Sequence, residues 1–78
     1  MELKFDKKII RELKGKGYNV NEMAQIIKEE LMDYDFEGST LFDVFFHYDG
    51  KMAYAQGKVT DGVAHCYGMS TNLKIIEE

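Results

Sequence analysis

The stretch FDVFFHYDGKMAYAQGKVTDGVAHCYGM, residues 42–69, decides the fold of this chain. It contains two Asp-Gly pairs, Asp49-Gly50 and Asp61-Gly62, which separate segments of alternating character. A type I′ hairpin turn needs positive φ at both central residues, and Asp-Gly favours this conformation. The pattern therefore predicts three antiparallel strands, at residues 40–48, 51–59 and 63–69.

The two turns also predict which residues share a face, because residues directly opposite in an antiparallel pair point the same way. One face is aromatic on the first strand and small on the other two. Its members are Phe42, Val44, Phe46, Tyr48, Ala53, Ala55, Gly57, Val59, Ala64, Cys66 and Gly68. We expect this face to be the core, with Cys66 acting as a small buried hydrophobe.

The opposite face is unusually apolar for a sheet surface turned to solvent, which normally alternates with polar residues. The same register places Phe45, Tyr54 and Met69 in one row across its middle. An exposed apolar patch of this kind indicates an interaction site. The predicted binding residues are Phe45, Tyr54, Tyr67, Met69, Met52, His47, His65, Asp43 and Lys58. Alternatively, the C-terminal segment with Leu73, Ile75 and Ile76 folds across this face.

Two helices are predicted before the strands. Asp6 is a suitable N-cap for the first helix, and glycines 15 and 17 end it. Asn19 and Glu22 form a capping-box pattern at the start of the second helix. Because few residues join the helices, we expect an αα-hairpin. The predicted fold is one α+β domain over residues 1–78, with this hairpin packed on one face of a three-stranded antiparallel meander, to which the tail LKII (residues 73–76) could add a fourth strand.

The charge is unevenly distributed along the chain. The net charge of −4 over 78 residues divides into +3 for residues 1–18, −7 for residues 19–49 and zero for the remainder. The stretch IIRELKGKGYNVNEMAQIIK, residues 9–28, resembles the first two helices of a helix-turn-helix. In that family the second helix enters the major groove, but here it carries Glu22, Glu29 and Glu30, which would face phosphates. Nucleic-acid binding through the basic first helix remains the alternative function, with candidate residues Lys7, Lys8, Arg11 and Lys14.

Metal binding has one weak candidate, the stretch DYDFEG at residues 33–38. It resembles the first half of an EF-hand loop, which implies Asp33, Asp35 and Glu37 as oxygen ligands. The last ligand position falls on Val44, where an EF-hand needs a glutamate. The histidines His47 and His65 lie three cross-strand rows apart, about 20 Å at ~3.3 Å per residue, so they cannot share an ion. We expect no metal and no cofactor.

The composition narrows the class of protein further. A flat, open sheet face with no nucleophile or cofactor motif predicts that the chain is not an enzyme. A single cysteine and no apolar run of ~20 residues favour a cytoplasmic setting without membrane spans. We expect a small stand-alone binding protein that docks another protein, or a second copy of itself as a homodimer, through the outer sheet face. Its small size is typical of an inhibitor or regulator, and we expect one carried by a phage or mobile element.

Overall fold

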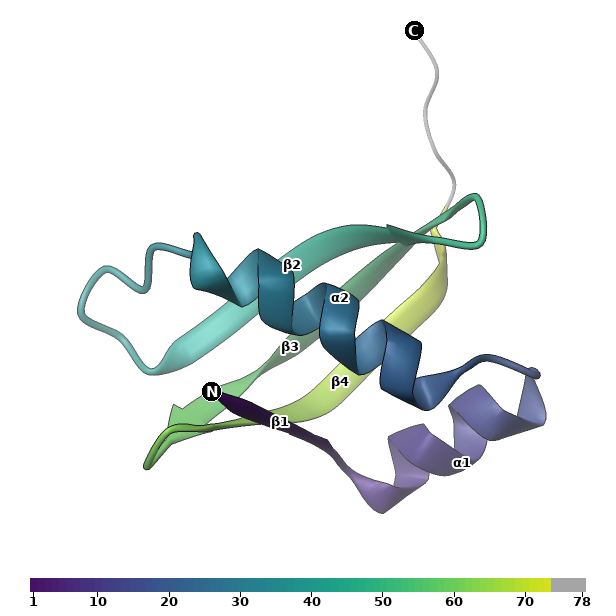
Figure 1. Ribbon diagram of the computed structural model, residues 1–78, viewed down its shortest axis with the longest axis horizontal. Helices are drawn as coiled ribbons and strands as arrows, with labels where there is room; N and C mark the ends of the chain where they lie inside the picture. The colour runs from purple at the N-terminus through teal and green to yellow at the C-terminus, as the bar shows by residue number, and fades with distance from the viewer. Residues whose placement is uncertain (74–78) are drawn as a thin grey trace, which may run out of the picture.

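The computed structural model describes residues 1–73, which form two helices and one four-stranded mixed sheet (Figure 1). The α+β class predicted from the sequence is confirmed. The elements in chain order are β1 (Glu2–Phe5), α1 (Lys7–Gly15), α2 (Val20–Met32), β2 (Leu41–Tyr48), β3 (Lys51–Thr60) and β4 (Val63–Leu73). The strand order across the sheet is β1-β4-β3-β2.

Strands β2, β3 and β4 form the predicted antiparallel meander. Asp49 and Gly50 have φ values of 52° and 72°, and Asp61 and Gly62 have 53° and 77°, as type I′ turns require. The register between β2 and β3 agrees with the prediction at each predicted pair, from Phe42 opposite Gly57 to Tyr48 opposite Lys51. The two turns were therefore sufficient to align these strands.

The register between β3 and β4 departs from the prediction after its first three pairs. Cys66 lies opposite Gly57 as expected, but Gln56 lies opposite Gly68, so Tyr67 has no partner on β3. This extra residue is a β-bulge. It shifts the next pairs by one position, as far as a second irregularity between Tyr54 and Met52. The predicted pairing of Met69 with Tyr54 is therefore wrong, and Met69 lies opposite Ala55 instead.

The fourth strand is also not where the sequence predicted it. It is β1, at the N-terminal end, and it pairs in parallel with β4, from Glu2 opposite Val63 to Phe5 opposite Cys66. The sheet is therefore mixed and not purely antiparallel. Leu73 is the last residue of β4, and the rest of the predicted C-terminal strand lies outside the described residues. The suggestion that Ile75 and Ile76 cover the outer face falls outside them as well.

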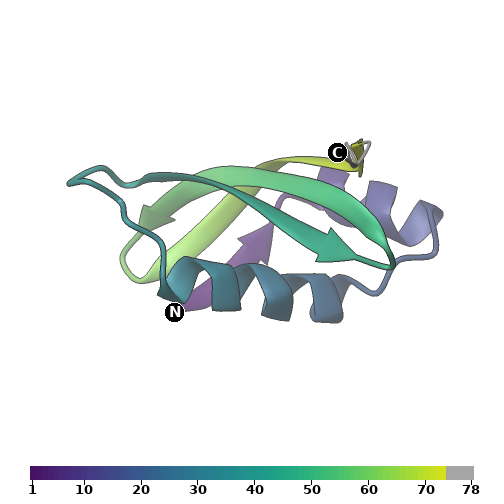
Figure 2. The same ribbon diagram turned by 90° about the horizontal axis from the view of Figure 1, so that it is seen from above.

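One hydrophobic core joins the helices to the predicted core face of the sheet. Helix α2 contributes Met23, Ile27 and Leu31, and α1 contributes Ile9 and Leu13. The sheet contributes its alternate residues, which are Phe42, Val44, Phe46, Ala53, Ala55, Ala64 and Cys66. Figure 2 shows α2 as a layer on one side of the strands and α1 at one end of the molecule. Helix α2 contacts β2 and β1, whereas α1 contacts α2 and β4.

The start of α2 is held by its own cap and by the sheet. The side chain of Asn19 accepts a hydrogen bond from the backbone N–H of Glu22 at 3.0 Å, as the capping pattern predicts. The backbone N–H of Asn19 donates to the hydroxyl of Tyr48 at 3.0 Å. The end of β2 therefore fixes the beginning of α2. Neither helix within residues 1–73 has the length and apolar character needed to cross a membrane.

Candidate functional site

The face of the sheet turned away from the core is the candidate site, and we call it the outer face. Its centre is the pair Phe45 and Tyr54, which lie opposite each other on β2 and β3. Their ring centroids are 4.9 Å apart and the rings are tilted by 47°. Phe45 is 60% exposed, so no part of the chain within residues 1–73 covers this ring. Strand register therefore holds an aromatic pair that is open to solvent, the kind of side chain that is enriched in interface hot spots.

Tyr67 lies on this face, where alternation along β4 already places it, and the bulge removes Met69 from the face. Tyr67 is 48% exposed and lines one pocket together with Tyr54 and Asp43. Met69 packs against the hydrophobic core, because the shifted register places it opposite the buried Ala55. The predicted row of Phe45, Tyr54 and Met69 is therefore corrected, and Ser70 takes the position opposite Tyr54.

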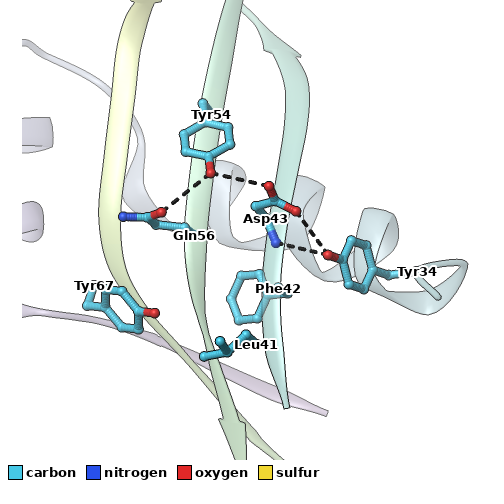
Figure 3. A pocket seen from close by; sticks show the side chains of 7 residues that line it. All are labelled: Tyr34, Leu41, Phe42, Asp43, Tyr54, Gln56 and Tyr67. Carbon is cyan, nitrogen blue, oxygen red and sulfur yellow. Dashed lines mark hydrogen bonds between the residues drawn. The ribbon is translucent and has the colours of Figure 1, made fainter. Parts of the chain in front are cut away.

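A carboxylate lies between two phenols beside the aromatic pair (Figure 3). The hydroxyl of Tyr34 donates to Oδ1 of Asp43 at 3.0 Å, and the hydroxyl of Tyr54 lies 3.4 Å from Oδ2. The Tyr54 hydroxyl also lies 3.4 Å from Oε1 of Gln56, so its single proton has two possible acceptors, both at long distance. The backbone N–H of Asp43 donates to the Tyr34 hydroxyl at 3.2 Å. Asp43 is thus fixed in orientation from both sides.

These contacts alter the acidity of Tyr54. Partial burial, the negative charge of Asp43 and the hydrogen bond to Asp43 all raise the pKa of Tyr54 above its ordinary value of 10.0. Each cause disfavours a phenolate beside a carboxylate. Tyr54 is therefore a neutral hydrogen-bond donor at physiological pH.

The two ends of the outer face each carry a histidine. His47 and Met52 lie opposite each other near the first turn, as predicted. At the other end, His65 lies opposite Lys58 on β3 and beside Lys4 on β1. Lys4 is an addition that β1 brings to this face. It completes a row of three basic side chains, and the two histidines belong to opposite ends of the face.

The residues proposed for the alternative functions are arranged differently. Lys7, Lys8, Arg11 and Lys14 are all exposed on α1. Within the described residues no three His, Cys, Asp or Glu side chains gather as a metal site would require, Asp33, Asp35 and Glu37 included. Instead, Asp35 accepts a hydrogen bond from the backbone N–H of Glu37 at 2.9 Å, which shapes the loop.

Cys66 is fully buried on the core face, and burial raises the pKa of its thiol to about 11. Weaker hydrogen bonds to the backbone around Gly68 and Gln56 oppose this shift. The predicted role of Cys66 as a small apolar core residue is confirmed, because a reactive thiol needs exposure and a lowered pKa.

Sequence reasoning missed Tyr34 as a site residue. Tyr34 continues the spacing of the apolar residues of α2, but the helix ends at Met32. The Tyr34 side chain instead reaches Asp43 on β2. The aromatic and acidic character of the loop from residue 33 to residue 38 was the available signal. Nothing in the spacing of residues indicates a contact with Asp43.

No protein-family model, curated protein or solved structure matches the chain. The properties of the outer face are therefore the basis for assigning a function.

Proposed function

We propose that this chain is a small non-enzymatic binding protein that docks another protein, or a second copy of itself, through its outer face. The observation that carries this proposal is the solvent-exposed ring of Phe45 against Tyr54, on a face that residues 1–73 leave open. Large aromatic side chains contribute much of the binding energy at protein interfaces, and few rotatable bonds have to be fixed. Phe45, Tyr54 and Tyr67 are the proposed anchors, and Met69 no longer belongs to them.

The surroundings of these anchors support an interface with a polar rim. Leu41 is 55% exposed at the start of β2 and extends the apolar area. His47 and Met52 lie at one end of the face, and Lys58 and His65 lie at the other. An apolar centre within a charged margin is the usual composition of a protein interface. We further infer that a regulator or inhibitor is the kind of protein that such a small binding surface suits.

The nucleic-acid alternative is supported by one specific feature, the row of Lys4, His65 and Lys58 beside Tyr67. Basic side chains next to aromatic rings can bind single strands by charge and stacking. The acidic Asp43 in the middle of the face opposes this, and so does the net charge of −4. We therefore favour a protein partner.

The test compares the wild type with Phe45→Ala and Tyr67→Ala. Met32→Ala is the matched control, because Met32 is 82% exposed on α2, away from the outer face. Light scattering after size exclusion gives the oligomeric state of each variant. If the wild type is a dimer, the two aromatic variants become monomers and the control stays dimeric. If it is a monomer, affinity capture with each variant as bait recovers the same partner for wild type and control only.

The proposal fails if neither aromatic variant changes self-association or capture. The nucleic-acid alternative makes a different prediction. Loss of basic side chains then matters most, either Lys7, Lys8 and Arg11 on α1 or Lys4 and Lys58 on the outer face, and affinity for a single-stranded oligonucleotide falls steeply with added salt.

A further inference from the structure

The outer face is hollowed beside the aromatic pair into an open pocket of about 300 Å³. Three tyrosines from separate parts of the chain surround it, with one carboxylate among them (Figure 3). The residues lining it are Tyr34, Leu41, Phe42, Asp43, Tyr54, Gln56 and Tyr67. None of these is basic. The pocket therefore combines aromatic walls with a single negative charge, which is the composition that cation recognition uses.

The carboxylate of Asp43 is held in place by hydrogen bonds, but its oxygens can still accept further ones. Each oxygen receives one hydrogen bond from a phenol, Oδ1 from Tyr34 and Oδ2 from Tyr54. A carboxylate oxygen has two lone pairs, so each keeps one acceptor site. A planar donor with two N–H groups can bond both oxygens of such a carboxylate at once.

We propose that this pocket binds the guanidinium group of an arginine side chain on a foreign protein partner. This inference rests on the proposed docking function and names the chemistry of the partner. A guanidinium can make two parallel hydrogen bonds to Asp43 and stack on a tyrosine ring at the same time. A lysine ammonium is a strongly hydrated point charge, so it can neither make the two parallel hydrogen bonds nor stack on a tyrosine ring.

The charge of the chain argues against its own arginine as the occupant. Arg11 is the single arginine of the sequence and lies on α1 with Lys7, Lys8 and Lys14. Docking this basic helix on the outer face of a second copy would bring it toward the row of Lys4, His65 and Lys58. Like charges at an interface disfavour such a pairing. A foreign partner can present arginine without the accompanying lysines.

The test is an NMR titration of the full chain with N-acetylarginine methylamide. We expect the largest shifts at Tyr34, Asp43, Tyr54 and Tyr67, and weaker binding of N-acetyllysine methylamide. Asp43→Asn should lower the arginine affinity about tenfold, since a charge-assisted pair is lost. Glu29→Gln removes the same charge from an exposed position on α2 and should leave the affinity unchanged. Lys58→Ala should raise the affinity for the arginine probe. Lys58 lies opposite Leu41, which lines the pocket, so its positive charge repels a bound guanidinium.

Three results would overturn this inference. In the first, Asp43→Asn binds the arginine probe as well as the wild type does. In the second, the lysine probe binds as tightly as the arginine probe. In the third, Lys58→Ala weakens binding of the arginine probe, although removal of a nearby positive charge should favour a cation. If wild type self-associates and Arg11→Ala abolishes it, the assignment to a foreign partner is wrong. Phe45 does not line the pocket, so Phe45→Ala tests docking separately from arginine recognition. If Phe45→Ala abolishes docking but the wild type does not bind the arginine probe, docking through the outer face stands and only arginine recognition by the pocket is rejected.

Discussion

The Tyr34 hydroxyl and Asp43 are joined twice, since the hydroxyl donates to Oδ1 at 3.0 Å and accepts the backbone N–H of Asp43 at 3.2 Å. Strand β2 is an edge of the sheet. An edge strand presents unpaired backbone groups that can pair with another chain. Tyr34 therefore occupies one donor of this edge and fastens the loop after α2 to the sheet.

Replacing Tyr34 by phenylalanine should remove both hydrogen bonds and keep the ring contact with Phe36, whose centroid is 4.8 Å away. We expect the free energy of unfolding to fall by about 1 kcal/mol, because the groups left behind can reach water. Urea denaturation measures this loss. Hydrogen exchange at the Asp43 amide should become faster, while the Val44 amide serves as an internal reference. Unchanged exchange at Asp43 would contradict the proposed protection.

Asp43→Asn should lower the pKa of Tyr54 toward its ordinary value. The substitution removes the negative charge and the carboxylate acceptor, which are two of the causes that raise this pKa. The titration of the Tyr54 ring carbon by NMR follows the change directly. Glu29→Gln should leave the Tyr54 titration where it is in wild type. A Tyr54 pKa that stays equally high in Asp43→Asn would assign the effect to burial alone.

The two glycines of β3 and β4 should respond very differently to alanine. A Cβ at Gly57 would collide with the backbone carbonyl of His65 and lie 2.6 Å from the Phe42 ring. A Cβ at Gly68 would meet only the side chain of Gln56, at 2.7 Å, and this side chain can move. We expect Gly57→Ala to lower the free energy of unfolding by about 3 kcal/mol or to prevent folding, as overpacking does. Gly68→Ala should cost less than about 1 kcal/mol. Equal melting temperatures for the two variants would contradict the backbone clash.

Cys66 should be unreactive in the folded protein. Burial raises its pKa from 9.0 to about 11, so little thiolate forms and the sulfur is inaccessible. Dithionitrobenzoate should label it at pH 8 only at the rate of unfolding or opening. Rapid labelling of the native protein would show that the sulfur reaches solvent.

The same shift makes stability depend on alkaline pH. The pKa of Cys66 is higher in the folded state than in the unfolded state. The buried neutral thiol therefore contributes fully to the free energy of unfolding below pH 9, and this contribution is lost as pH rises from 9 toward 11. The loss should approach roughly 2 kcal/mol. The difference in unfolding free energy between wild type and Cys66→Ala, measured at pH 8 and 10.5, isolates this part from other titrating groups. It should shrink at the higher pH.

Alanine substitutions at the neighbouring phenylalanines of β2 should differ strongly in their effect on stability. Phe46 is 2% exposed in the core, so Phe46→Ala should lower the free energy of unfolding by about 3–5 kcal/mol. Phe45→Ala should change it by less than about 1 kcal/mol, because the ring is open to solvent and loses mainly its contact with Tyr54. Thermal unfolding of both variants checks this. A large loss in Phe45→Ala would mean that the outer face is structural.

The part of the fold that follows from local chemistry could be predicted from the sequence. Each Asp-Gly turn fixes the residues on either side of it, so the alternation of Phe42 to Tyr48 was enough to assign the two faces of β2 and β3. The cap at Asn19 is equally local. These features depend on residues close together in the chain, where turn conformation and side-chain period leave few alternatives.

The features that escaped prediction depend on contacts between distant segments. Strand β1 is a short run, ELKF, and becomes a strand only because β4 offers it a free edge. The bulge at Tyr67 inserts a residue without any turn signal in the sequence. Tyr34 reaches Asp43 through tertiary structure alone. As a result, Phe45 and Tyr54 were placed correctly, whereas Met69 was not.

The parallel pairing of β1 with β4 has a consequence for the order of folding. Glu2 and Val63 are separated by 63 − 2 = 61 positions, whereas each hairpin joins neighbouring segments. Closing so long a loop costs more entropy than closing a hairpin, and such contacts form late. During synthesis residues 2–5 must wait until residues 63–66 have left the ribosome. Once β4 has emerged, its edge has no partner until β1 docks on it, and in this interval the chain is most exposed to misassembly with its own copies.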